Sequence, residues 1–237
     1  MSLVIKICGL RTPEALDASL HAGADMVGFV FFPPSPRHVD FAVARELGAR
    51  VKGRAMKVAL SVDAEDEWLA ASIEALAPDL LQLHGKETPE RVLAVKARFG
   101  LPVMKAIAVQ NRNDLACVAA YAEVADRLIF DARAPPDATR PGGLGKPFEW
   151  RLLRNLDPCV PFMLSGGLNR DNVAEAIEMA GTGGVDVSSG VERATGEKDP
   201  DLIRSFIRAA RTPSSPACGG EPGRGERGGR SAVSSEP

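Results

Sequence analysis

The side chains that could do acid–base chemistry in this sequence stand at the ends of short apolar runs. The first is Cys8, which ends the run 4–8 directly before Gly9. A short run rich in Ile and Val that stops at a glycine predicts a buried strand that delivers the thiol to a loop. A thiolate can act as a base, but a buried cysteine is more often a small packing residue. Both interpretations of Cys8 stay open at this point.

Later apolar runs also carry polar residues near their C-terminal ends. These are Lys6 with Cys8, Gln82 with His84, and Asp186 with Ser188, together with Lys105, Asp131 and Ser165. Side chains alternate between the two faces of a strand, so residues two apart share a face. Each pair therefore projects to one side of its strand, and the apolar neighbours project to the other.

Eight such runs alternate with eight helical patterns, and this alternation predicts the scaffold. The expected strands are 4–9, 26–32, 56–62, 80–84, 103–109, 127–131, 162–165 and 185–188, and the expected helices are 13–22, 41–51, 65–77, 89–99, 113–122, 148–153, 169–179 and 200–210. Apolar strands that alternate with helices are typical of a parallel α/β sheet, and eight pairs close a (β/α)8 TIM barrel. A doubly wound open sheet is the alternative, but no GxGxxG follows the first run.

The chain divides by composition into a body and a tail. We expect residues 1–211 to form the single catalytic barrel domain. Residues 212–237 are rich in Gly, Pro, Ser, Arg and Glu and have almost no apolar residue. Such a segment cannot bury enough surface to offset its ordering entropy, so we expect a disordered tail.

In a TIM barrel the outer strand faces lie under helices, so we expect the polar set, Lys105 included, to face inward. Active sites of this fold lie at the C-terminal mouth of the barrel. Buried polar groups without partners are costly, which favours a functional role for so many of them at one place. A salt-bridged or water-filled barrel interior is the structural alternative.

Two glycine-rich turns and one arginine are candidates for binding anions. Gly166 and Gly167 follow the seventh run, before a helix that we expect Asn169 to cap, and residues 188–190 follow the eighth. Glycines let backbone N–H groups approach an anion closely, and in TIM barrels a phosphate often binds at these two loops. Arg37 follows a stiff proline-rich loop, where its guanidinium fork suits a carboxylate, although a solvated surface arginine is the ordinary alternative.

Composition excludes several classes of partner. The formal net charge is −2, which gives no bulk attraction for nucleic acid or an anionic membrane, and no segment is long enough to span a bilayer. The four cysteines form no CxxC pair and the three histidines are dispersed, so we expect neither a metal site nor a disulfide scaffold. We expect a cytoplasmic protein without cofactor, as a monomer or homodimer.

Several motifs together resemble one family in order and spacing. They are 6–9 (KICG), 28–31 with 35–37 (GFVF and SPR), 82–85 (QLHG), 130–131 (FD), 142–145 (GGLG), 164–168 (LSGGL) and 185–192 (VDVSSGVE). This set resembles phosphoribosylanthranilate isomerase of tryptophan biosynthesis, over about residues 4–210. The resemblance implies a TIM barrel that carries out an Amadori rearrangement of N-(5-phosphoribosyl)anthranilate without metal or cofactor.

The resemblance also implies a role for each matching residue. Cys8 resembles the general base and Asp131 the general acid, and a lowered thiol pKa, which Lys6 could supply, would help Cys8 to act near neutrality. Arg37 resembles the residue that holds the anthranilate carboxylate. The remaining substrate-binding positions are His84, Gly143, Gly145, Gly166, Gly167, Asp186, Ser188, Ser189 and Gly190.

Two positions depart from the family pattern. Leu144 replaces a small hydroxyl residue and Glu149 replaces an aspartate. Both bear on how the stretch 135–145, a candidate mobile lid, closes over a substrate. The alternatives are another phosphosugar barrel, either a synthase with Lys6 or Lys105 as its acid or a metal-dependent epimerase, and a catalytically silent scaffold.

Overall fold

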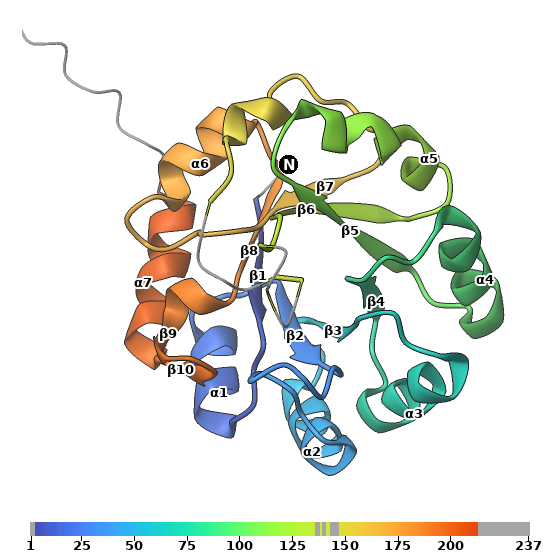
Figure 1. Cartoon of the computed structure of the whole chain (residues 1–237). Coiled ribbons are helices and arrows are strands. Elements are labelled where there is room, and N and C mark those ends of the chain that lie inside the picture. Colours follow the sequence, from blue (N-terminus) through green and yellow to red (C-terminus); the bar gives the residue numbers. More distant parts are fainter. Residues whose placement is uncertain (1–2, 136–137, 139–140, 143–146, 213–237) are drawn as a thin grey trace, which may run out of the picture.

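The computed structural model describes residues 3–135, 138, 141–142 and 147–212. Eight parallel strands close into one barrel in sequence order, with the first strand paired to both the second and the eighth (Figure 1). They are β1 (Val4–Cys8), β2 (Met26–Val30), β3 (Met56–Ser61), β4 (Leu80–Leu83), β5 (Val103–Val109), β6 (Arg127–Ala132), β7 (Phe162–Leu164) and β8 (Gly184–Val187). The predicted TIM barrel is confirmed.

A ring of helices surrounds the barrel (Figure 1). The α-helices are α1 (Pro13–His21), α2 (Phe41–Val51), α3 (Asp66–Leu76), α4 (Pro89–Phe99), α5 (Val118–Ala122), α6 (Val173–Ala180) and α7 (Pro200–Arg211), and the 3-10 helices are η1 (Arg112–Cys117), η2 (Trp150–Leu153) and η3 (Ser189–Val191). The side chains of Thr12, Thr88 and Asp199 accept N–H groups in the first turns of α1, α4 and α7, and a proline follows each cap. A capping side chain followed by proline is a strong sequence signal for the beginning of a helix.

The helical segments predicted at 113–122 and 169–179 differ most from the structure. The segment 113–122 is divided between η1 and α5. The expectation that Asn169 caps a helix is wrong, because Asn169 Oδ1 instead accepts from the N–H groups of Asp171 (2.8 Å) and Asn172 (3.2 Å) in a turn. Helix α6 begins at Val173. The short antiparallel hairpin of β9 (Glu192–Ala194) and β10 (Glu197–Lys198) has no counterpart in the prediction.

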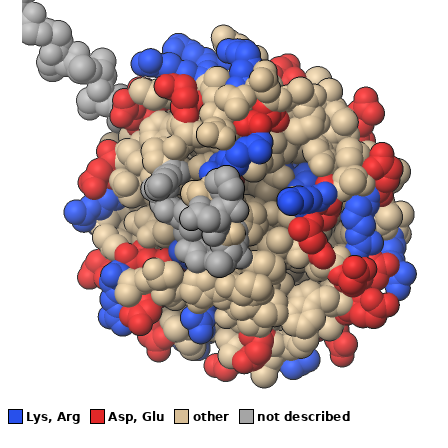
Figure 2. All heavy atoms as spheres, viewed as in Figure 1, with Lys and Arg blue, Asp and Glu red and all other residues tan. Residues whose placement is uncertain are grey.

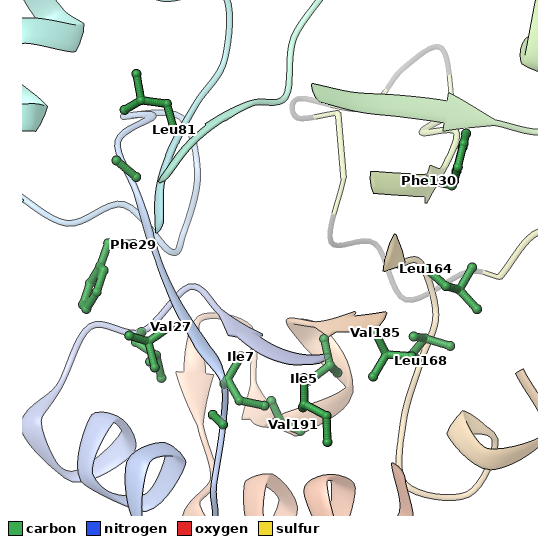
Figure 3. Packing of buried hydrophobic residues seen from close by; sticks show 14 of the residues in the cluster. Ile5, Ile7, Val27, Phe29, Leu81, Phe130, Leu164, Leu168, Val185 and Val191 are labelled. Atoms are coloured by element: carbon green, nitrogen blue, oxygen red, sulfur yellow. The ribbon is translucent and has the colours of Figure 1, made fainter. Parts of the chain in front are cut away.

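Apolar side chains form two layers on opposite sides of the strands. Ile5, Ile7, Val27 and Val185 belong to the large outer core between barrel and helices (Figure 3). Inside, the N-terminal part of the barrel is filled by Met26, Val58, Leu80, Met104, Ala106, Ile129 and Met163. This inner layer closes the barrel from below, so a site can form only at its C-terminal mouth.

The predicted inward orientation of Lys105 is wrong. Its strand neighbours Met104 and Ala106 face the interior, whereas Val103 and Ile107 belong to the outer core. Lys105 shares the outer face and donates from Nζ to Glu87 Oε2 at 2.9 Å. Strand parity therefore removes Lys105 from the mouth and with it one candidate acid for the synthase alternative.

Helix α7 is the last element that the structure describes. Helix α7 ends at Arg211, and residues 213–237 lie outside the described residues, so the predicted boundary and tail stay predictions. Among the helices described here, none combines the length and the apolar character needed to cross a bilayer.

Candidate active site

A cleft that is open to solvent lies at the C-terminal mouth of the barrel. The predicted site residues that line it are Cys8, Arg37, His84, Asp131, Gly166, Gly167, Asp186, Ser188 and Ser189. Gly143 and Gly145 lie outside the described residues. Figure 2 shows basic and acidic side chains interspersed over this face of the molecule.

Cys8 lies next to a buried ion pair. Lys6 Nζ is 2.8 Å from Asp186 Oδ1, and the two side chains are 0% and 4% exposed. Ser165 Oγ donates to the other oxygen of Asp186 at 3.1 Å. A Cβ atom on Gly28 would lie 3.0 Å from Cys8 Sγ and 3.1 Å from Lys6 Nζ, so the thiol and the ammonium flank one glycine. The glycine leaves room for both groups.

Burial and the neighbouring ion pair together shift the pKa of the Cys8 thiol. Burial raises the pKa of Cys8 above its ordinary value, and the Lys6 ammonium opposes the shift without reversing it. The expected lowering of the thiol pKa is therefore wrong for this structure. Burial alone would lower the pKa of Lys6, but the Asp186 carboxylate raises it above its ordinary value, so Lys6 stays a cation beside the thiol.

Asp131 is held at the end of β6 by a chain of side chains. His84 Nε2 lies 3.2 Å from Asp131 Oδ2, and Gln82 Nε2 lies 2.9 Å from His84 Nδ1. These two contacts hold the imidazole ring of His84 between the Gln82 amide and the Asp131 carboxyl group. The backbone N–H of Ala132 donates to the second oxygen at 2.8 Å. Strand β4 thus orients the carboxylate of β6.

The two glycine turns pack against each other and against the β6 end. Gly166 and Gly167 have φ values of 88° and 68°, which favour glycine. A Cβ on Gly166 would lie 2.6 Å from Ala132 N, and one on Gly190 would collide with the carbonyl oxygen of Leu168. Gly190 therefore serves the contact between the turns. Successive backbone N–H groups in such turns can hold an anion.

Arg37 is a buried residue, and the solvated-surface alternative is wrong for it. Its side chain is 5% exposed, and its Nε and Nη2 donate to the two oxygens of Glu192 at 2.7 and 2.8 Å. Gly9, with φ of 79°, makes room for the arginine, because a Cβ there would lie 2.8 Å from Arg37 Cδ. The cleft beside Arg37 has an apolar wall, made by Val30, Phe32, Leu60 and Val62.

Sequence reasoning missed the partners of these residues. Glu192 lies within the stretch 185–192, but nothing in its type or spacing indicated that it holds Arg37. Lys198 lies on a strand of two residues, which has no periodicity to detect. Glu149 accepts the Arg151 N–H at 3.3 Å and so caps η2, whereas Leu144 lies outside the described residues. No metal-binding group of three or more His, Cys, Asp or Glu side chains occurs in the described part of the chain.

The fold and the cleft define the class of protein. A closed (β/α)8 barrel with a thiol and an oriented carboxylate in one mouth cleft is an enzyme of the TIM-barrel type, equipped for acid–base chemistry. A family model described as N-(5'phosphoribosyl)anthranilate (PRA) isomerase matches residues 5–209. The chain belongs to the N-(5'-phosphoribosyl)anthranilate isomerase family.

Individual relatives agree with this assignment. The N-(5'-phosphoribosyl)anthranilate isomerase of Nitrobacter winogradskyi is 66% identical over 211 residues, which cover 89% of this chain and 94% of the relative. The crystal structure of phosphoribosyl anthranilate isomerase from Thermotoga maritima matches with a TM-score of 0.80 at 36% identity, over 88% of this chain and 98% of that chain. A crystal structure of such an isomerase with reduced 1-(o-carboxyphenylamino)-1-deoxyribulose 5-phosphate matches at 0.77 and 33% identity, with coverage of 88% and 98%.

Proposed function

We propose that this enzyme converts N-(5'-phosphoribosyl)anthranilate to 1-(2-carboxyphenylamino)-1-deoxyribulose 5-phosphate in L-tryptophan biosynthesis, with Cys8 as general base and Asp131 as general acid. The observation that carries the assignment is that one cleft is lined by both groups, from strands β1 and β6 that are not neighbours in the barrel. A sugar bound between them meets an acid on one side and a base on the other.

Ring opening and the loss of the C2 proton each need one catalytic proton transfer, and over the whole reaction the substrate gains as many protons as it loses. The protonated carboxyl of Asp131 gives its proton to the ribose ring oxygen as the bond from C1 to that oxygen breaks, which leaves a Schiff base between C1 and the anthranilate nitrogen. The Cys8 thiolate then removes the proton from C2, and the electron pair of that bond neutralises the protonated Schiff base to give an enol. The enol becomes the ketone of the product as its oxygen loses a proton and C1 gains one, and exchange with solvent returns the thiolate and the protonated carboxyl group. His84, which contacts Asp131 Oδ2, orients the acid throughout.

The substrate has two anionic ends, and the cleft offers a different environment for each. We place the anthranilate carboxylate at Arg37, with its ring against the apolar wall of Val30, Phe32, Leu60 and Val62. We place the phosphate at the glycine turns, formed by Gly166, Gly167, Ser188, Ser189 and Gly190, and the sugar hydroxyls near His84 and Asp186. Gly143 and Gly145 keep their predicted substrate-binding role as a prediction, because they lie outside the described residues.

The partner and location proposals follow from the same substrate. The enzyme takes one small phosphosugar, uses no cofactor or metal, binds neither nucleic acid nor membrane, and acts in the cytoplasm as a monomer or homodimer. The formal net charge of −2 supports the absence of a polyanionic partner.

The test is a fluorescence assay with freshly generated phosphoribosylanthranilate and EDTA present, which follows the loss of anthranilate-type emission. We expect turnover in the wild type and a loss of about 10²-fold or more in Cys8→Ala and in Asp131→Ala. Cys117→Ala, which removes an exposed thiol, is the matched control and keeps full turnover. A wild type without turnover above the non-enzymatic background would support the silent-scaffold alternative, unchanged turnover in Cys8→Ser would refute Cys8 as the general base, and activity lost in EDTA would show a metal requirement.

A further inference from the structure

The β9–β10 hairpin carries a buried charge cluster that no step of the reaction uses. Glu192 accepts both donors of Arg37, and Lys198 Nζ lies 2.6 Å from Glu192 Oε1. The side chains of Glu192 and Lys198 are 4% and 2% exposed. Lys198 Nζ also donates to the carbonyl oxygen of Ser188 at 2.9 Å and lies 3.2 Å from its hydroxyl. One chain of contacts therefore joins Arg37 to the turn after β8.

The backbone of the hairpin holds the same loop from outside. Gly196, at the hairpin turn, has φ of 82°, and its N–H donates to Glu192 Oε2 at 3.1 Å. A Cβ on Gly196 would lie 2.6 Å from the carbonyl oxygen of Pro36. Arg11 Nη1 donates to that same carbonyl at 2.7 Å. The residue before Arg37 is thus fixed by contacts from two other segments.

The cluster keeps one net positive charge. Arg37 and Glu192 alone would be neutral, and Lys198 restores a surplus cation next to the cleft. Burial favours a neutral Glu192, but Arg37 and Lys198 outweigh it and lower the pKa of Glu192 to about 2. Burial lowers the pKa of Lys198 to about 8 while Glu192 opposes the shift, so the lysine is mostly charged at neutral pH. All three groups therefore carry their charges near neutrality.

We propose that Glu192 and Lys198 are positioning residues for carboxylate recognition. Glu192 fixes the guanidinium plane of Arg37 by a bidentate contact, and Lys198 balances the charge of Glu192 so that Arg37 keeps its attraction for a substrate carboxylate. The attachment of Lys198 to Ser188 sets the distance between the carboxylate end and the phosphate end of the cleft. The inference rests on the proposed role of Arg37 in binding the anthranilate carboxylate.

Isothermal titration with two ligands tests this role. The first ligand is reduced 1-(o-carboxyphenylamino)-1-deoxyribulose 5-phosphate, and the second is the same compound without its carboxyl group. We expect Glu192→Gln and Lys198→Met each to raise the Kd of the first ligand about tenfold or more, and to leave the Kd of the second within about twofold. A purely structural role would weaken both ligands equally, so equal weakening overturns the proposal, as does no weakening.

The substitution Glu192→Gln also separates position from charge. It raises the net charge of the cluster from one to two, so a purely electrostatic role predicts tighter binding of the carboxylate. A positioning role predicts weaker binding, because an amide cannot accept from both Arg37 donors. Tighter binding would therefore overturn the proposal. Glu192→Asp keeps the charge but withdraws the carboxylate by one methylene, and it shows the same selective weakening should the glutamine variant fail to fold.

Two further variants complete the experiment. Glu197→Gln is the matched control, since Glu197 lies on the same hairpin and pairs only with the exposed Arg193 among the contacts described for it. We expect it to leave both Kd values unchanged. Arg37→Ala tests the underlying assignment separately. If it leaves the Kd of the carboxylated ligand unchanged, the clamp itself is refuted, whereas an effect of Arg37→Ala without an effect at Glu192 or Lys198 refutes only the positioning role.

Discussion

Two buried lysine–carboxylate pairs lie on opposite faces of the same barrel wall. Inside the barrel, Lys6 Nζ is 2.8 Å from Asp186 Oδ1, directly beside the thiol of Cys8. Outside it, Lys105 Nζ is 2.9 Å from Glu87 Oε2. Both pairs are almost fully buried, and both lysines come from strands. Because side chains alternate between the two faces of a strand, the position of each lysine along its strand decides whether its side chain faces the barrel interior or the outer core.

The two carboxylates differ in what else they bind. Asp186 accepts one further side chain, the hydroxyl of Ser165. Glu87 accepts the backbone N–H groups of Asp63, at 2.9 Å, and of Gly85, at 2.9 and 3.1 Å. The inner pair therefore acts on other side chains, whereas the outer pair ties two loop backbones together.

The outer pair acts on the site only through the backbone. Lys105 Nζ donates to the carbonyl oxygens of Leu83 (3.3 Å) and Gly85 (2.8 Å), the two residues that flank His84. His84 in turn orients Asp131. The comparison teaches that the pKa of the Cys8 thiol is changed by a charge beside it, whereas the carboxyl group of Asp131, our proposed general acid, is positioned by the backbone behind it.

The largest expected effect follows from breaking the inner pair. Lys6→Met leaves Asp186 buried and unpaired, which costs about 3–5 kcal/mol of unfolding free energy. Turnover falls by about 10²-fold or more, because the cation that favours the thiolate is gone. Urea unfolding and the fluorescence assay measure the two effects. We expect the double variant Lys6→Met/Asp186→Leu to recover most of the stability but none of the turnover. Normal turnover in this double variant would contradict the role of Lys6 in favouring the Cys8 thiolate.

Breaking the outer pair has the next largest effect, and it has a different signature. Lys105→Met costs about 3–5 kcal/mol of unfolding free energy for the same reason, but turnover falls less than about tenfold. Adding Glu87→Leu does not restore stability, because the N–H groups of Asp63 and Gly85 lose their acceptor at about 1–3 kcal/mol each. Full recovery of stability in that double variant would show that the loop contacts to Glu87 are dispensable.

The fold was predictable because its signal is repeated. Eight apolar runs with caps such as Thr12 and Thr88 each indicate the same unit, so an error in one, such as the late start of α6 at Val173, leaves the topology intact. The β9–β10 hairpin was not predictable, since a strand such as Glu197–Lys198 is too short to show alternation.

The parts of the site that could be predicted are those that depend on local sequence, namely the alternation of side chains along a strand and the glycines in the turns. Cys8, Asp131, Gly166 and Gly167 line the cleft as expected, whereas Gly190 is not among its lining residues. The predicted inward orientation of Lys105 was wrong because the polar character of a residue within an apolar run does not show which face of the strand its side chain takes. The predicted lowering of the Cys8 thiol pKa was wrong. Burial, which the sequence does not show, raises this pKa more than the adjacent Lys6 lowers it.

The smallest expected effect is a change in the pH dependence of Cys8 alkylation, which tests how the inner ion pair acts on the thiol. Only a thiolate reacts with iodoacetamide, so below the thiol pKa the alkylation rate rises tenfold for each pH unit. Because burial raises the pKa of Cys8 above its ordinary value of 9.0, we expect the rate still to be rising at pH 9. Mass spectrometry follows the reaction in a Cys117→Ser/Cys159→Ser/Cys218→Ser background, with glutathione as the reference thiol.

Substitutions at the two lysines are expected to give different results in this assay. Lys6 lowers the pKa of Cys8 more strongly than Asp186 raises it, so Lys6→Met with Asp186→Leu moves the alkylation curve to higher pH. Lys105→Met leaves the curve in place, since Lys105 lies on the other face of the barrel wall. A curve that reaches its plateau below pH 8, or one that moves as far with Lys105 as with Lys6, would mean that the thiol is controlled by something other than its buried neighbour.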